Sequence, residues 1–263
     1  MSIVDFHVHA FPDSLAERAT ARVERAAGVR SFQNGTIASL LASMDKAGIG
    51  RSVILSIATR PSQFEPILEW SQTIRSPRIV PFLSVHPADP QAAEKIQLAA
   101  SMGFKGFKFQ PYYQEFSLDE ERMFPIYEAM QETGLICVSH TGFDTSHPYV
   151  RVADPPRILR VLERFPSLTF VATHLGAWQD WDLVAELLPK ARLWTDISYT
   201  LPFLPAERAR SLITAFPTDR LLFGSDSPWA DQAESIRMLR GLGLGPTLEK
   251  AILGGNAEKL LDR

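Results

Sequence analysis

The sequence has one cysteine, no surplus of either charge and no long apolar run, and each absence excludes a class of protein. A single Cys137 in 263 residues excludes an internal disulfide framework and a cysteine-rich zinc site. The 27 Lys and Arg side chains nearly balance 30 Asp and Glu, which excludes a strongly basic nucleic-acid binder. No apolar run reaches the ~18 residues of a transmembrane helix, and Met1 to Phe6 lacks the basic start of a signal peptide. We therefore expect a cytoplasmic protein with neither a nucleic-acid nor a membrane partner.

The sequence does contain a regular alternation of short apolar runs and amphipathic segments. Eight runs have the length and composition of strands: 3–8, 52–57, 79–85, 105–110, 135–140, 168–174, 192–198 and 221–226. After the first gap, successive runs lie about 24 to 33 residues apart, the length of a strand plus a crossover helix. The pattern predicts an α/β fold, a distorted (β/α)₈ TIM barrel that forms a single domain over residues 1–263. A doubly wound sheet is disfavoured, because no Gly-x-Gly-x-x-Gly follows the first run.

One segment breaks this regularity. Residues 10–35 form an insertion after the first predicted strand, and 14–26 within it read as a short helix. The insertion lies on the side of the barrel where active sites form. It is equally consistent with a lid or wall of a pocket and with a plain surface loop.

Five polar side chains fall near the carboxyl ends of predicted strands, which converge on one mouth in a barrel. They are His7, His9, His140, His174 and Asp226. The two-residue period of a strand places His7 and His9 on the same face, with Asp5 one step below. Imidazole and carboxylate ligands suit Zn²⁺, and also Mn²⁺, Fe²⁺ or Co²⁺. The pattern therefore predicts a divalent-metal site.

Four short motifs resemble the amidohydrolase superfamily, in particular the amidohydrolase-related branch that includes aminocarboxymuconate-semialdehyde decarboxylase-like enzymes. They are His7-x-His9, His140-Thr141-Gly142, His174-Leu175-Gly176 and Gly224-Ser225-Asp226, and the resemblance extends over essentially the whole chain. It implies that His7, His9, His140 and Asp226 bind one metal ion. It further implies that Asp226 accepts a proton from the attacking water. His174 then lies beside that water and the substrate, or alternatively binds a second metal.

Lys108 leaves the number of metal ions open. Binuclear relatives carry a strand-four lysine, carboxylated by CO₂, that bridges two ions, and Lys108 occupies that strand. Alternatively, Lys108 binds substrate or pairs with an acid. Relatives with this lysine often have a histidine two residues later, where this chain has Gln110. Lys108 and Gln110 share one face of the strand, and Phe107 and Phe109 share the other.

Further side chains follow predicted strands and are candidates for substrate binding: Arg60, Gln110, Tyr112, Trp178 and Trp229. An arginine grips a carboxylate through two hydrogen bonds, and aromatic walls suit a planar or apolar small molecule. Each residue is also explained by a surface ion pair or by packing.

The sequence predicts a metal-dependent hydrolase that activates water for attack on an ester, lactone or amide carbonyl. The first alternative is a metal-dependent, non-oxidative decarboxylase of an aromatic or unsaturated acid, which would use the same ligands. The second is a barrel that binds a small molecule without catalysis. Related enzymes often form dimers, so we expect a homodimer.

Overall fold

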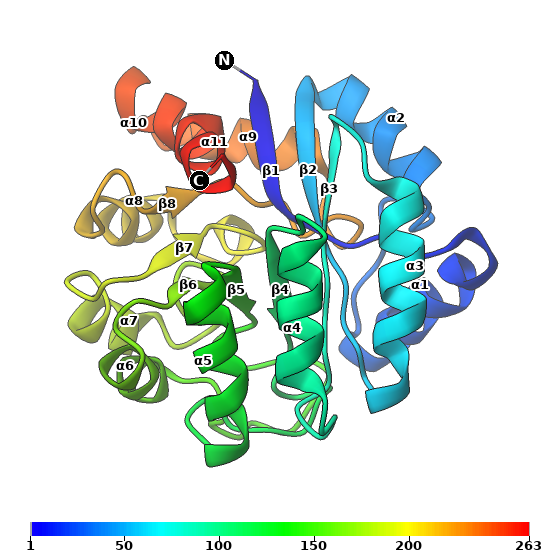
Figure 1. The fold of residues 1–263 in the computed structure, drawn as a ribbon. Helices are drawn as coiled ribbons and strands as arrows, with labels where there is room; N and C mark the ends of the chain where they lie inside the picture. The colour runs from blue at the N-terminus through cyan, green and yellow to red at the C-terminus, as the bar shows by residue number, and fades with distance from the viewer. Residues whose placement is uncertain (1, 263) are drawn as a thin grey trace.

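The computed structural model describes residues 2–262, in which eight strands surround a common axis and helices cover them (Figure 1). Each strand overlaps one of the predicted runs. The strands are β1 Ile3–Val8, β2 Ile49–Leu55, β3 Ile79–Phe82, β4 Gly106–Phe109, β5 Ile136–Ser139, β6 Thr169–Ala172, β7 Trp194–Asp196 and β8 Leu221–Leu222. Every pair of neighbouring strands within a sheet is parallel. The predicted TIM-barrel fold is confirmed.

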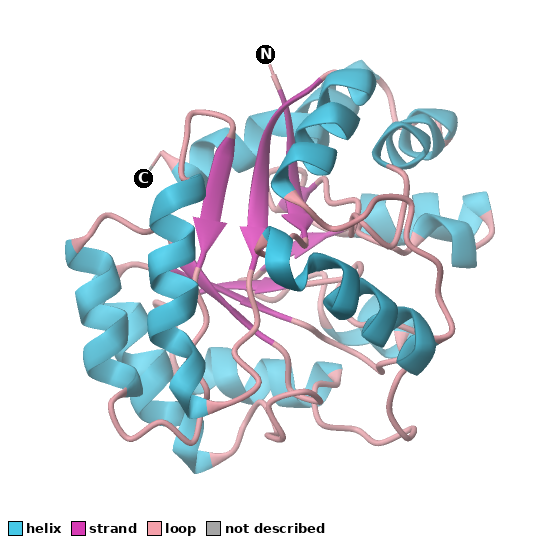
Figure 2. Ribbon diagram, turned by 90° about the vertical axis from the view of Figure 1, so that its right-hand side faces the viewer, coloured by secondary structure: helices cyan, strands magenta, loops and turns pink. Residues whose placement is uncertain are grey.

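Helices follow the strands and lie on the outside of the barrel (Figure 2). They are α1 Asp13–Ala27, α2 Ile37–Ala47, α3 Phe64–Ile74, α4 Ala92–Ser101, α5 Phe124–Thr133, α6 Pro155–Arg164, α7 Trp181–Leu187, α8 Ala206–Ala215, α9 Gln232–Gly241, α10 Pro246–Lys250 and α11 Asn256–Leu261. Short turns of helix lie at η1 Pro61–Gln63, η2 Glu121–Met123, η3 Leu201–Phe203 and η4 Ala251–Gly255. The helix α1 confirms the predicted helix in the insertion.

Two seams distort the barrel. The strands form one sheet of β1 to β3 and another of β4 to β8. Isolated bridges join the sheets, Leu83 with Phe107 at one seam and Val8 with Ser227 at the other. The backbone N–H of Lys108 donates to the carbonyl of Leu83 over 2.8 Å. Because both seams are hydrogen-bonded, the side chains at the strand ends keep fixed positions around one mouth.

The barrel opens at one end only. Alternate strand residues, including Phe6, Leu55 and Val138, fill its interior as a separate apolar cluster. Leu260 and Leu261 of α11 belong to this cluster, so the last helix covers the amino-terminal end of the strands. At that end α11 also contacts β1 (Figure 1). The opposite, carboxyl end is left for a pocket.

The first strand departs from the predicted alternation. Between Asp5 and Val8, β1 takes three residues where β2 takes two, which is a β-bulge. Phe6 therefore packs into the barrel interior, yet the next residue, His7, still reaches the site. Asp5 does not lie below the histidines as expected. It does not line the cavity, and its carboxylate accepts hydrogen bonds from the backbone N–H of His7 at 3.3 Å, from that of Ser225 at 2.9 Å and from the Ser225 hydroxyl at 2.6 Å.

Two sequence-based expectations concern residues away from the site. Cys137 is buried on β5, where burial raises the pKa of its thiol, and it packs as a small apolar side chain. Among residues 2–262, no helix is both long enough and apolar enough to cross a bilayer.

Candidate active site

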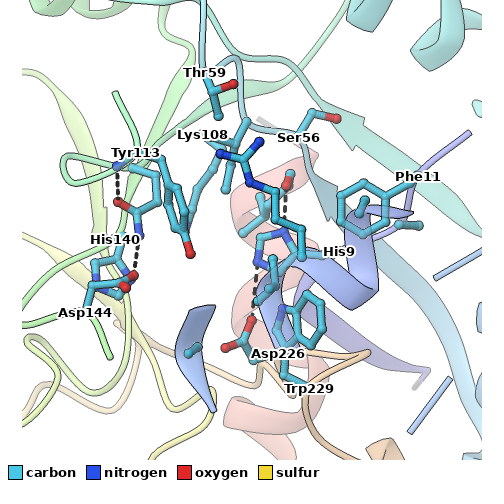
Figure 3. A pocket seen from close by; sticks show the side chains of 18 of the residues that line it. His9, Phe11, Ser56, Thr59, Lys108, Tyr113, His140, Asp144, Asp226 and Trp229 are labelled. Carbon is cyan, nitrogen blue, oxygen red and sulfur yellow. Dashed lines mark hydrogen bonds and ion pairs between the residues drawn. The ribbon is translucent and has the colours of Figure 1, made fainter. Parts of the chain in front are cut away.

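A cavity of about 450 Å³ lies at the carboxyl ends of the strands (Figure 3). Every residue of the predicted metal site lines it: His7, His9, Lys108, His140, His174 and Asp226. These residues come from β1, β4 and the segments that directly follow β1, β5, β6 and β8. The structure therefore brings together side chains separated by more than 200 residues, as strand-end convergence predicts.

The carboxylate of Asp226 lies between the two histidines of the first motif. Its Oδ1 is 3.4 Å from Nε2 of His7 and 3.3 Å from Nε2 of His9. Donor atoms of His7, His174 and Asp226 all lie within 4.8 Å of one another. These three donor atoms are spaced to share one ion, so His174 lies within the group itself. The predicted ligands His9 and His140 lie beside it, His9 3.3 Å from Asp226 and His140 3.1 Å from His174.

Hydrogen bonds on the far side of each ring orient His7 and His9. Nδ1 of His7 lies 2.9 Å from Oδ2 of Asp196, and Nδ1 of His9 lies 2.9 Å from the carbonyl oxygen of Leu55. Both partners accept hydrogen bonds, so in the neutral rings Nδ1 carries the hydrogen and Nε2 presents its lone pair to the cavity. A carboxylate or carbonyl behind an imidazole is the usual support of a metal-binding histidine.

His140 and His174 face each other with Nδ1 of the first 3.1 Å from Nε2 of the second. The other nitrogen of each ring contacts a backbone carbonyl, that of Phe143 at 3.0 Å and that of Ser198 at 3.1 Å. Burial lowers the pKa of His140 to about 4 and that of His174 to about 3, so both rings are neutral near pH 7. Each neutral ring therefore donates its one N–H to a backbone carbonyl. The lone pairs on Nδ1 of His140 and Nε2 of His174 then point at each other and repel. A bound cation removes this repulsion, so the residues fit a metal ion.

Asp226 and Asp196 are ionised despite their burial. Burial by itself would raise the pKa of Asp226 and of Asp196, but their interactions with the neighbouring histidines, chiefly His7, hold both pKa values below their usual range. His174 and Asp226 also have left-handed backbones, with φ of 59° and 69°. Such strain in residues other than glycine is concentrated at functional sites.

The motif glycines have a steric explanation. A Cβ added to Gly142 would lie 2.0 Å from the backbone nitrogen of Trp178, and one added to Gly224 would lie 2.7 Å from Cβ of His7. Neither position tolerates a side chain without displacing a neighbour. The two glycines thus allow the loops after β5 and β6 to meet and allow the chain after β8 to approach β1.

Lys108 is only 1% exposed, and its Nζ has no hydrogen-bond partner among the described residues. Burial lowers the pKa of this amine to about 8. Lys108 and Gln110 both line the cavity, while Phe107 and Phe109 pack outward against the helices, as predicted. The amide of Gln110 donates to Oδ2 of Asp144 over 2.6 Å. Gln110 therefore stabilises a wall of the pocket. Lys108, in contrast, has a polar group that no described residue hydrogen-bonds.

The candidates for substrate binding divide into two groups. Arg60, Trp178 and Trp229 line the cavity, Arg60 as an exposed side chain at its mouth. Tyr112 instead lies behind the wall, with its hydroxyl 2.9 Å from the carbonyl oxygen of Gly142. The adjacent Tyr113 occupies the lining position (Figure 3).

Two features escaped the sequence analysis. One is Asp196, which orients His7. It is the last residue of the seventh strand, and this position at a strand end could have indicated a place at the site. The insertion is a wall of the cavity, since one face of α1 lines it, including Arg18 and Arg22. The four-residue spacing of these arginines in the predicted helix could have indicated that shared face.

The sequence profile of the amidohydrolase family matches residues 4–263. The chain belongs to the amidohydrolase family. Its members are metal-dependent enzymes, which agrees with the donor set that lines the cavity.

Proteins similar to this chain differ in their activities. The chain is 25% identical over 183 residues to a dihydroorotase from Azotobacter vinelandii, covering 65% of this chain and 47% of that protein. It thus spans about half the length of this curated relative. A TIM-barrel protein from Bordetella bronchiseptica is 21% identical, with a TM-score of 0.82 and coverage of 100% and 99% of the two chains. A manganese complex of 5-carboxyvanillate decarboxylase from Novosphingobium aromaticivorans is 16% identical, with a TM-score of 0.73 and coverage of 100% and 96%. These structures share the fold of this chain.

Proposed function

We propose that this protein is a metal-dependent hydrolase of a lactone, ester or cyclic amide. The observation that carries the proposal is the set of inward lone pairs on His7, His9 and His140 beside the ionised Asp226. Nitrogen and oxygen donors of this kind suit zinc, with manganese as the alternative. When bound, the ion would polarise the substrate carbonyl and acidify water.

The residues of this chain supply the remaining parts of hydrolysis. Asp226 is the one ionised carboxylate that faces both His7 and His9, so its free oxygen is placed to accept the proton of the attacking water. His174 donates its Nδ1–H to the carbonyl of Ser198, so Nε2 is left as an acceptor that orients the attacking water. The aromatic wall of Trp178 and Trp229 excludes bulk water from the reacting carbon.

The positive charge of Lys108 supports hydrolysis rather than decarboxylation. Hydrolysis builds negative charge on the carbonyl oxygen, and an unpartnered ammonium in a buried site stabilises that charge. Decarboxylation moves charge out of a carboxylate, so a cation next to the carboxylate would stabilise the starting state instead. We assign Lys108 to the substrate oxygen rather than to a bridge between two metals.

The second candidate is a non-oxidative decarboxylase of an aromatic acid. The aromatic walls of the pocket support it, as does the similarity in fold to 5-carboxyvanillate decarboxylase. In that reaction the same ligands would bind the oxygens of the substrate, and a pocket acid would protonate the ring carbon.

The products separate the two reactions. Zinc-loaded and manganese-loaded protein is incubated with dihydrocoumarin, dihydroorotate and 2,6-dihydroxybenzoate, with Asp226→Asn as the control. Ring-opened acid from either of the first two, lost in the control, supports the hydrolase. Release of CO₂ from the benzoate without ring opening of the other compounds would overturn it in favour of the lyase.

A further inference from the structure

The outer half of the pocket has a charge distribution that the proposed hydrolysis does not use. Three arginines line it, Arg18 and Arg22 from α1 and Arg60 from the segment after β2. The acids among the described lining residues are Asp144 and Asp226, and both lie at the buried end beside the histidines (Figure 3). The mouth is therefore cationic, although the whole chain has a net charge of −3.

The helix α1 presents these arginines as part of a continuous face. Its lining residues recur at helical spacing, at positions 15, 18, 19, 22, 23 and 27. Leu15, an exposed leucine, lies on this face with Arg18 and Arg22. The arrangement sets an apolar surface beside two cationic groups, which suits a ligand with an apolar body and an acidic end.

The guanidinium groups are available for a ligand. Arg18, Arg22 and Arg60 are exposed, and none of them forms a side-chain ion pair within residues 2–262. Other arginines of the chain are already paired, such as Arg151 with Asp180. Arg22 lines the same cavity as Tyr113, which comes from the segment after β4.

We propose that Arg18 and Arg22 of α1, with Arg60, form an anion subsite that binds a second acidic group of the substrate. This inference rests on the proposed function, which places the reacting carbonyl at the buried end. The pocket then selects a planar dicarboxylate or a cyclic carbonyl compound that carries a carboxylate. Arginine binds such a group through two parallel hydrogen bonds, and the apolar walls between the two ends contact the ring.

Electrostatics gives this subsite a second effect. Arginines at the rim of a cavity with apolar walls raise the local concentration of an anion and speed its entry, and salt weakens that effect. A monoanion held at one end alone gains little from the rim. The subsite therefore distinguishes ligands by the number and spacing of their acidic groups.

The test is calorimetric binding of benzoate, isophthalate, terephthalate and homophthalate to the zinc-loaded protein. The test variant is the double substitution Arg18→Gln/Arg22→Gln. The matched control is Arg25→Gln, because Arg25 is an exposed arginine of α1 that does not line the cavity. We expect at least one dicarboxylate to bind about tenfold or more tightly than benzoate. The double variant should abolish this preference and reduce its salt dependence, and the control should retain both.

Two results would overturn the subsite. One is the absence of any preference for a dicarboxylate in the parent protein, including the absence of binding. The other is a preference that the double variant retains, or loses no more than Arg25→Gln does. These readouts need no turnover, so failure of the hydrolysis assay leaves them interpretable. Conversely, hydrolysis of an uncharged lactone without any dicarboxylate preference would retain the proposed function and reject the subsite.

Discussion

The buried end and the mouth of the pocket are built in opposite ways. At the buried end each imidazole is held by a hydrogen bond from behind, as His7 is by Asp196 and His9 by the carbonyl of Leu55. At the mouth, Arg18 and Arg22 are exposed side chains without an ion pair among residues 2–262. One end therefore has hydrogen bonds that fix its geometry, whereas the side chains at the other lack such support among the described residues.

Because of this difference, we expect the barrel strands to determine the chemistry and the insertion to determine substrate selectivity. The groups at the buried end come from the barrel strands and the chain that directly follows them, and hydrogen bonds across the seams fix the barrel. The mouth is formed partly by the insertion, which can change without altering the strand ends. Substitutions at the buried end should therefore affect metal binding and turnover, and those at the mouth should affect substrate affinity.

The largest effect is expected at Asp226. Asp226→Asn removes the ionised oxygen shared by His7 and His9, so we expect activity to fall by about a thousandfold or more. Zinc content per chain, measured by mass spectrometry, should fall with it. The control is Asp182→Asn, an acid on α7 whose side chain is 93% exposed. Full metal occupancy and activity in Asp226→Asn would contradict the assignment of metal binding and turnover to the buried end.

Asp196 tests whether the hydrogen bonds behind the rings matter. Asp196→Ala leaves Nδ1 of His7 without its carboxylate partner, so the ring loses its fixed orientation. We expect metal affinity, measured by competition with a chelator, to fall about 10- to 100-fold. Ser198→Ala is the comparison, since its hydroxyl also lies 2.9 Å from Nδ1 of His7 but carries no charge. An equal loss in both variants would show that packing, rather than the carboxylate, orients the ring.

The sequence predicts the buried end better than the mouth, for physical reasons. Strand periodicity and convergence of parallel strand ends place His140, His174 and Asp226 together without any side-chain detail. The bulge in β1 could not be predicted, because an extra residue in a strand leaves the apolar pattern almost unchanged and yet reverses the face of Asp5. The direction in which α1 faces depends on packing, so the position of Arg22 on the cavity wall could not be predicted from the sequence.

The pH dependence of stability tests the burial of the imidazoles. His140 has an ordinary pKa of 6.5 when unfolded and about 4 when folded, so between these values only the unfolded chain binds the proton. Stability of the metal-free protein should therefore fall as the pH drops from 6.5 toward 4, by about 3 kcal/mol from His140 alone. Urea unfolding at a series of pH values measures this loss.

His140→Gln provides the matched variant for that experiment, because it removes one titrating group. Its unfolding free energy should depend less steeply on pH over the same range, while His174, with a pKa lowered to about 3, retains its own contribution. Asp196 and Asp226, whose pKa values are lowered in the folded protein, stabilise it above their unfolded pKa near 3.8, and this stabilisation is lost only at lower pH, outside this range. Identical slopes for parent and variant would mean that His140 is not desolvated in solution.

The smallest effect is expected at Leu15, at the mouth. Its side chain is 41% exposed and lines the cavity from α1, so Leu15→Ala removes apolar contact with a substrate but little packing within the protein. We expect KM to rise a few-fold, with kcat and zinc content unchanged, because such contact binds substrate and transition state equally. Leu98→Ala is the control, since Leu98 is 47% exposed on α4 and does not line the cavity. A fall in kcat for Leu15→Ala would instead mean that α1 positions the reacting atoms, so selectivity and chemistry would not be separable along this pocket.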